Sequence, residues 1–373
     1  MNLKSTIFTM LFLFGSFFQI FAQNSILVVS SATGVKKVLQ LSSTDGAVLN
    51  ANFIDLTAQN VGTIKGVAQV NDKIWVTDQT NDKIYIYDLT GAYVSTIATG
   101  LDNVRGINVV NNEVWVANDG NANGSTADSI IRYSTTGTFI GIYTAPNTSI
   151  FDMIDNKSGV VYVTGLDTNG IQKLNYSGAS VGSLVAPGVF QNLQQLNIMA
   201  NGNILAAVFQ NHSTSGNNAG VYVLSPTNGS ILNFYPVATG NLRGVIQTDN
   251  GNILYTTGSA LFSINPATSV QTQLVSGQFQ FLTKALIPSL AVSEVKGLSF
   301  KIYPNPVDDV INIEAKGDLQ KIEIYTSDGR LLKKQMINNE KKSQINVSDL
   351  GTGNYYMVLQ IDGQLNKHQF IKK

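Results

Sequence analysis

A short apolar segment recurs at nearly regular intervals along the first three quarters of the chain. Its six copies are centred on Leu27, Trp75, Trp115, Tyr162, Leu205 and Leu254. Successive centres are 48, 40, 47, 43 and 49 residues apart. A repeat of this length indicates an array of similar structural units.

Each unit contains about four short strands separated by turn residues. The second unit predicts strands over Gly66–Val70, Ile74–Asp78, Lys83–Asp88 and Tyr93–Ala98. The turns between them are Asn71-Asp72, Asn81-Asp82 and Thr90-Gly91. Val, Ile, Tyr and Trp fill the strands, and the repeats contain no sustained 3.6-residue apolar period. Four strands in 40 to 49 residues are typical of a β-propeller blade.

Six units predict six blades, of which the first is incomplete. Its apolar segment at Ile26–Ser30 corresponds to the second strand of the other units, so an innermost strand is missing. We expect Phe279–Ile287, which follows the sixth unit, to pair beside Ile26–Ser30 and close the ring. Closure would remove an exposed sheet edge. A β-helix and a sandwich are the alternative folds.

The best-matched repeats run from Lys65-Gly66-Val67 to Trp75-Val76 and from Arg105-Gly106-Ile107 to Trp115-Val116. Together with Lys83–Asp88 and Thr90-Gly91, these repeats resemble those of NHL-type six-bladed propellers. The resemblance extends over residues 25 to 287 and is specific in the second and third units.

The N-terminus predicts a signal peptide. Lys4 precedes the apolar run Ile7–Phe21, and Ala22 supplies a small residue before cleavage, with Gln23 as the first mature residue. The alternative is an uncleaved anchor helix, for which the run is short. No other segment is apolar enough to cross a membrane.

Charge is concentrated near the C-terminus. Residues 293 to 373 hold 12 of the 24 Lys and Arg residues and 10 of the 24 Asp and Glu residues. This shift marks a domain boundary near 288–298. The expected organisation is a signal peptide at 1–22, a propeller at 23–288, a linker at 289–298 and a second domain at 299–373.

The second domain reads as a small, seven-stranded, immunoglobulin-like β-sandwich. Its ordered motifs resemble the type A C-terminal sorting domain of Bacteroidetes type IX secretion cargo. The residues that carry the resemblance are Tyr303, Pro304, Asn305, Pro306, Gly329, Arg330, Leu350, Gly353 and Tyr355, followed by Lys372-Lys373. The resemblance implies that the type IX machinery exports the protein to the outer surface, with removal of the tail.

Composition excludes several classes of site. The chain has no Cys and only two His residues, His212 and His368, so thiolate sites and multi-histidine metal sites are excluded. The formal net charge is zero, which gives no support for a nucleic-acid partner.

One loop has the first half of a calcium-binding pattern. Asp119, Asn121 and Asn123 alternate before Gly124, and Asp128 follows as a further oxygen ligand. Position twelve is Ile130 instead of Glu, so this is a weak calcium candidate, and the alternative is a plain surface loop. We expect no other cofactor.

Three polar residues are expected on innermost strands, where they would line the central channel: Asn108, Asp152 and Asn197. Metal-dependent lactonase-like propellers have acids and Asn there, which leaves a metal-assisted hydrolase or lyase as an alternative. The equivalent positions of Trp75 and Trp115 favour core packing over a sugar-binding platform.

We therefore expect a secreted surface protein that is not an enzyme, whose propeller presents loops for an unknown protein or glycan ligand. A structural component of an adhesive surface layer is a third hypothesis. The sequence identifies neither the ligand nor the oligomeric state.

Overall fold

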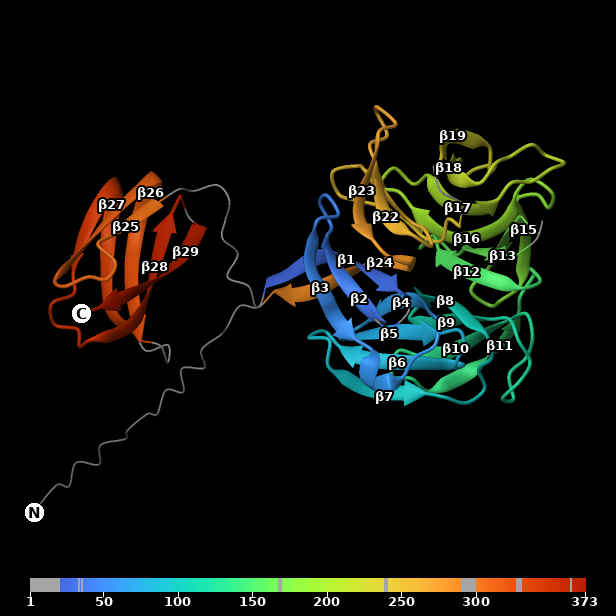
Figure 1. The fold of residues 1–373 in the computed structure, drawn as a ribbon, viewed down its shortest axis with the longest axis horizontal. Coiled ribbons are helices and arrows are strands. Elements are labelled where there is room, and N and C mark those ends of the chain that lie inside the picture. The colour runs from blue at the N-terminus through green and yellow to red at the C-terminus, as the bar shows by residue number, and fades with distance from the viewer. Residues whose placement is uncertain are drawn as a thin grey trace, which may run out of the picture. The chain divides into compact units, whose positions relative to one another are not determined.

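The repeating units of the sequence fold into four-stranded antiparallel sheets (Figure 1). The structure is a computed structural model that describes residues 21–32, 34, 36–166, 170–237, 241–289, 300–326, 331–362 and 364–373. The chain divides into two compact units, Met1–Pro288 and Ser289–Lys373. The division falls where the composition of the sequence changes.

Six four-stranded sheets occur in the described part of the first unit, one for each repeat, and each is a propeller blade. The first blade, in sheet order, contains β24 (Phe279–Ser289), β1 (Phe21–Ser30), β2 (Lys37–Ser42) and β3 (Val48–Asp55), and a 3-10 helix, η1 (Thr57–Gln59), follows β3. The second contains β4 (Ile64–Val70), β5 (Lys73–Asp78), β6 (Lys83–Asp88) and β7 (Tyr93–Ile97). The third contains β8 (Val104–Val110), β9 (Glu113–Asn118), β10 (Ser129–Ser134) and β11 (Phe139–Thr144).

The other three blades follow in chain order. The fourth contains β12 (Ile150–Asp155), β13 (Val161–Gly165), β14 (Ile171–Leu174) and β15 (Ser180–Val185). The fifth contains β16 (Gln191–Ile198), β17 (Ile204–Gln210), β18 (Gly220–Leu224) and β19 (Ile231–Pro236). The sixth contains β20 (Val245–Gln247), β21 (Ile253–Thr256), β22 (Ala260–Ile264) and β23 (Gln271–Ser276).

The strands predicted for the second unit are confirmed within two residues at each end. The turns between them use the left-handed backbone that Asn, Asp and Gly tolerate best. The φ angles of Asn71, Asp82 and Gly91 are 53°, 55° and 88°. The turn chemistry in the sequence therefore sets where each strand ends.

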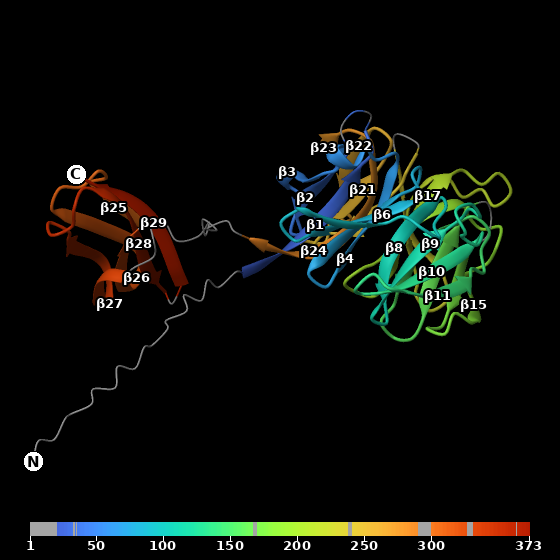
Figure 2. The same ribbon diagram turned by 90° about the horizontal axis from the view of Figure 1, so that it is seen from below.

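The first blade is assembled from both ends of the propeller. β24 pairs with β1, which confirms the predicted closure, and both views show the two strands side by side (Figures 1 and 2). The amide of Ser31 donates to the carbonyl of Gln278 at 2.9 Å just beyond the paired strands. The side chain of Gln69 on β4 bonds both backbone groups of Leu286, at 2.6 and 3.2 Å. β24 is therefore held by the blade it completes and by the next blade.

Alternate residues of β1 pack against different neighbours, as the two faces of a strand require. Leu27 and Val29 lie in a buried cluster shared with the second blade. Ile26 and Val28 lie in a cluster shared with the sixth blade. β1 is therefore apolar on both faces, and the closing blade packs against both neighbouring blades through buried apolar side chains.

Innermost strands of neighbouring blades approach closely enough to require glycine. A Cβ atom on Gly66 would lie 2.6 Å from the carbonyl oxygen of Arg105. A Cβ atom on Gly106 would lie 2.3 Å from the Asp152 carboxylate. These contacts explain why Gly follows a basic residue at the same position of two repeats.

Three buried threonine hydroxyls join adjacent blades at this point. The Thr77 hydroxyl accepts from the Gly66 amide of its own blade at 2.8 Å and donates to the Arg105 carbonyl of the next at 2.6 Å. Thr164 and Thr256 each accept from an amide of their own blade and donate to a carbonyl of the next blade. Thr164 donates to β16 and Thr256 donates to β24. The other three blades have Ala117, Ala207 and Val29 at the equivalent position, so the clasp occurs in every second blade.

The second unit has five strands in its described residues: β25 (Phe300–Tyr303), β26 (Val310–Thr326), β27 (Leu331–Asn346), β28 (Gly353–Ile361) and β29 (Gln364–Lys372). Seven strands were predicted, and the count differs because β26 and β27 are long and continuous. Their register shifts between Glu314 and Leu319. The first part of β26 pairs with β25 and the second part with β28, so each long strand supplies two of the seven predicted segments. The two parts enclose one apolar cluster that includes Ile313, Ile324 and Phe370.

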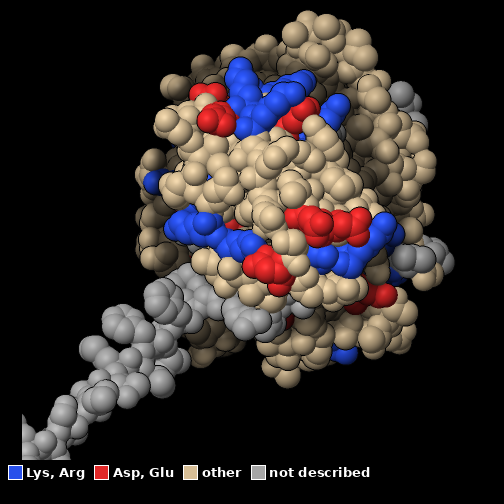
Figure 3. Space-filling view, turned by 90° about the vertical axis from the view of Figure 1, so that its left-hand side faces the viewer, with Lys and Arg blue, Asp and Glu red and all other residues tan. Residues whose placement is uncertain are grey.

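Basic and acidic side chains lie close together on the face shown in Figure 3. In the second unit, Glu323 pairs with Lys321 and Lys334, at 3.3 and 3.5 Å. Lys342 pairs with Glu314 at 2.6 Å. Some of the charged residues of this unit therefore form local ion pairs.

Replacing Thr77 by Val tests the threonine clasp. The valine has a similar shape but leaves the buried Gly66 amide without its acceptor, so we expect the free energy of unfolding to fall by about 1–3 kcal/mol. Thr77→Ser keeps the hydroxyl and should cost less. Urea denaturation followed by tryptophan fluorescence reports on the propeller alone, because both Trp residues of the chain belong to it. A Thr77→Val protein as stable as the wild type would contradict this role.

Candidate binding sites in the propeller channel

Two cavities lie at opposite ends of the innermost strands. The amide-lined cavity, of about 390 Å³, is formed mainly where β8, β12, β16 and β20 approach their C-terminal ends. The cationic cavity, of about 400 Å³, is formed where β4, β8, β12 and β24 begin. The innermost strands run in the same direction around the ring, so their two ends define two separate mouths.

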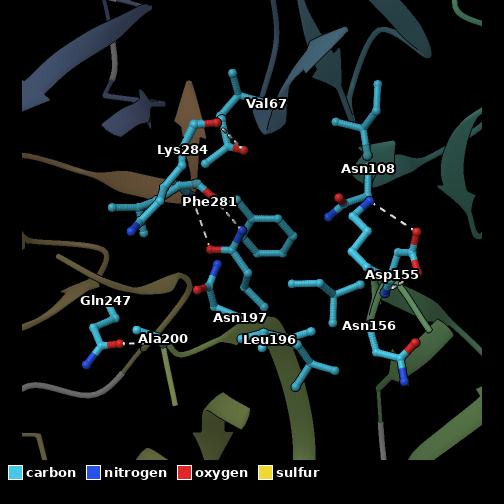
Figure 4. Close-up of a pocket in the computed structure, with 17 residues that line it drawn as sticks. Val67, Asn108, Asp155, Asn156, Leu196, Asn197, Ala200, Gln247, Phe281 and Lys284 are labelled. Carbon is cyan, nitrogen blue, oxygen red and sulfur yellow. Dashed lines mark hydrogen bonds and ion pairs between the residues drawn. The ribbon is translucent and has the colours of Figure 1, made fainter. Parts of the chain in front are cut away.

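Amide side chains surround the first cavity (Figure 4). Asn108 donates to the Met153 carbonyl at 3.0 Å, and Gln247 accepts from the Ala200 amide at 2.9 Å. Asn197 is half-buried and forms no side-chain hydrogen bond with another described residue. The Asn197 amide is therefore available to a ligand.

Gln195 lies deeper and holds three innermost strands together. Its amide nitrogen donates to the Leu282 carbonyl at 2.7 Å. Its amide oxygen accepts from the backbone amides of Val245 and Leu282, at 3.2 and 3.1 Å. These bonds tie β16 to β20 and β24, so this side chain acts in positioning the channel strands.

The sequence placed Asn108, Asp152 and Asn197 in the channel, and the structure separates them. Asn108 and Asn197 line the amide-lined cavity, as predicted. Asp152 is 1% exposed and accepts from the Leu196 amide at 3.1 Å. Burial raises the pKa of Asp152 to about 7, against the opposing effects of backbone hydrogen bonds and of the Lys65 charge. Asp152 thus joins β12 to β16 beneath the cavity.

A metal-assisted reaction requires a set of ligands, and the channel provides none in its described residues. No three His, Cys, Asp or Glu side chains of the described chain lie close enough to share a metal ion. The hydrolase alternative therefore gains no support from the geometry.

Most residues of the calcium candidate form hydrogen bonds or ion pairs with other residues of the protein. Asp119 accepts from Arg105 at 2.6 Å and from Asn103 at 2.7 Å. Asn123 donates to Asp82 at 3.0 Å, and Asp128 accepts from the Ser149 amide. Asn121 is exposed. Calcium binding remains a prediction, which titration calorimetry with CaCl₂ tests directly.

Both tryptophans pack in the propeller core. Trp75 and Trp115 are each 1% exposed and lie edge-on to Tyr133 and Tyr143, respectively. The Trp115 indole donates to Glu113 at 2.9 Å. These positions confirm the core interpretation, and neither indole offers a platform to a sugar.

The cationic cavity was not predicted from the sequence. Lys65, Arg105 and Arg243 line it, together with Gln194, Gln280 and Phe151. The signal was present as a basic residue before Gly at the start of three innermost strands, in Lys65-Gly66, Arg105-Gly106 and Arg243-Gly244. Only the ring fold shows that these three residues converge.

The sorting motifs are structural elements of the second unit. β25 ends at Tyr303. The next residue, Pro304, has no backbone N–H to donate to a neighbouring strand, so the strand does not continue through it. The Asn305 side chain forms two hydrogen bonds with the backbone of β29. It donates to the Gln369 carbonyl at 3.2 Å and accepts from the Ile371 amide at 2.9 Å. Tyr355, two residues after Gly353, stacks on Phe370 and donates to Gly351 at 2.8 Å, and Leu350 packs against the apolar cluster.

Gly329 and Arg330 lie outside the described residues, as does most of the predicted signal peptide. Ala22 and Gln23 belong to β1, and cleavage between them remains a prediction.

Residues 301–373 match the family of secretion system C-terminal sorting domains. The C-terminal unit is thus a type IX sorting domain, which indicates secretion to the cell surface. Within the described chain, no helix has the length and apolar character needed to span a membrane. No curated protein matches the sequence.

Several solved structures are similar to this chain at low sequence identity. A structure of a nidogen/laminin complex has a TM-score of 0.57 at 16% identity, covering 71% of this chain and all of that one. A protein of unknown function from Bacteroides caccae has a TM-score of 0.51 at 13% identity, covering 70% of this chain and 99% of that one. The WD40 β-propeller domain of Doa1 is also similar, with a TM-score of 0.46 at 12% identity, covering 72% and 81%.

Asp152→Asn tests the state of the buried carboxyl group. A carboxyl whose pKa is raised on folding stabilises the protein fully below its unfolded value of 3.8, and that contribution is lost as the pH rises through about 7. The wild-type propeller should therefore lose up to about 4 kcal/mol relative to Asp152→Asn between pH 4 and pH 8. Urea denaturation across this range measures the difference. Parallel stability curves for the two proteins would contradict the raised pKa.

Proposed function

We propose that the protein is a surface binding protein that holds a carbohydrate ligand in the amide-lined cavity. The observation that carries the proposal is the composition of this cavity, whose lining includes the amide side chains of Asn108, Asn156, Asn197 and Gln247 together with Phe281. Amides donate and accept at once, which suits the hydroxyl groups of a sugar.

Two further features support binding. Part of the cavity wall is apolar and is formed by Ile107, Leu196 and Phe281. A few polar groups placed within an apolar surface are typical of small-ligand sites. Lys157 and Lys284 lie at its rim and are exposed. Secretion to the cell surface would place such a site in contact with external glycans.

A glycan array probed with the purified full chain tests the ligand class. We expect binding to a defined set of hydroxyl-rich glycans, with competition by the free oligosaccharide. Absence of binding to any glycan on a diverse array would overturn the carbohydrate proposal and favour a protein ligand.

Asn197→Ala tests the location of the site. Because Asn197 bonds no other described residue, its loss should leave stability unchanged and weaken glycan binding about 3- to 10-fold. Asn218→Ala is the matched control, since Asn218 is exposed in the loop between β17 and β18, at the other end of the blade. Equal affinities for the two variants, measured by calorimetry, would place the ligand elsewhere.

A further inference from the structure

The cationic cavity brings together three positive side chains that lie far apart in the sequence. Lys65 comes from β4 and Arg105 from β8, and Arg243 lies two residues before the start of β20. Lys65 is 1% exposed and Arg105 is 4% exposed. Burying like charges is costly unless an opposite charge compensates them.

The protein itself supplies only part of that compensation. Arg105 pairs with Asp119 at 2.6 Å and also donates to the backbone carbonyls of Ser149 and Ile150, at 3.1 and 3.0 Å. Lys65 donates only to neutral amides, Gln194 at 3.1 Å and Gln280 at 2.8 Å. Arg243 forms no ion pair with any residue of the described chain and rests on the Phe209 ring, 4.6 Å from its centre. No described Asp or Glu lines this cavity.

Aromatic rings provide weak stabilisation and leave donors unused. The Phe151 ring lies 4.6 Å from the Lys65 ammonium and 4.5 Å from the Arg105 guanidinium. The Nε atoms of Arg105 and Arg243 are buried and have no acceptor among the described residues. A buried donor without an acceptor in a native protein needs an explanation, and a bound ligand is one.

The three cations also act on one another. Burial lowers the pKa of Lys65 well below its ordinary value, and the charges of Arg243 and Arg105 lower it further, against the smaller opposing effect of the buried Asp152 carboxyl group. An anion in the cavity would remove this repulsion and supply the missing acceptors.

We propose that the cationic cavity is a second binding site, which holds the oxyanion group of a small ligand, such as the carboxylate of an acidic sugar, between Lys65, Arg105 and Arg243. The fork of an arginine matches the two oxygens of a carboxylate or sulfate group. The amide nitrogen of Gln194, which donates to no other described residue, would meet a polar group of the ligand. This site lies at the opposite channel mouth from the amide-lined cavity and does not depend on it.

Calorimetric titration of the full chain with glucuronate, glucose and sodium sulfate tests the proposal. We expect glucuronate to bind and glucose, which lacks the carboxylate, not to compete with it. Sulfate should compete with glucuronate if the oxyanion is the group recognised. A protein that binds neither glucuronate nor sulfate would overturn the proposal.

Arg243→Gln is the decisive variant. It removes the charge without breaking any hydrogen bond among described residues, so the protein should fold normally and bind the anion about 10- to 100-fold more weakly. Arg243→Lys should retain part of the affinity. Lys173→Gln on β14 is the matched control for loss of one positive charge, because Lys173 does not line the cavity. Unchanged affinity in a folded Arg243→Gln protein would overturn the proposal, whereas Asn197→Ala should not affect anion binding.

Discussion

Closure of the ring by β24 is the constraint on which the rest of the propeller depends. This strand completes the sheet that β1 begins, and its neighbours on either side hold it through Gln69 and Thr256. It also brings Gln280 to the cationic cavity and Phe281 to the amide-lined cavity. A chain end that seals the sheet edge therefore also forms part of both candidate sites, and the stability of the ring and the shape of the channel are properties of one strand.

The channel is held by buried polar groups as well as by apolar packing. Thr77, Thr164 and Thr256 clasp alternate pairs of blades, Gln195 ties β16 to β20 and β24, and Asp152 ties β12 to β16. Each of these side chains satisfies backbone groups that the closely packed innermost strands could not satisfy among themselves. Most polar residues near the axis thus have a structural role. The exceptions, Asn197 and Arg243, are the residues to which the binding proposals attach.

Much of the fold could be predicted because it follows from local patterns. Strand periodicity and turn residues such as Asn71 and Asp82 set the blades, and the unpaired segment Phe279–Ile287 indicated the closure.

The candidate sites were harder to predict from the sequence. Asn108 and Asn197 were predicted in the channel, but Lys65, Arg105 and Arg243 are separated by 40 and 138 residues in the sequence, and only the ring brings them together. Asp152 was misjudged as a channel residue, because its strand is innermost but its side chain points between strands. In the second unit, a register shift divides the continuous strand β26 into two paired segments, and turn signals in the sequence do not tell one such strand from two.

Secretion and binding are separate properties carried by the two units. The sorting domain directs the chain to the surface, and the propeller carries both cavities, so the account depends most on the propeller being closed as a single ring. Hydrogen–deuterium exchange of the full chain tests this directly, by comparing the backbone amides of β24 with those of β16 in the same molecule. If β24 closes the ring, both sets should exchange equally slowly, through global unfolding of the propeller. Fast exchange of β24 while β16 stays protected would show that the last strand opens on its own, and it would contradict a channel whose shape depends on closure.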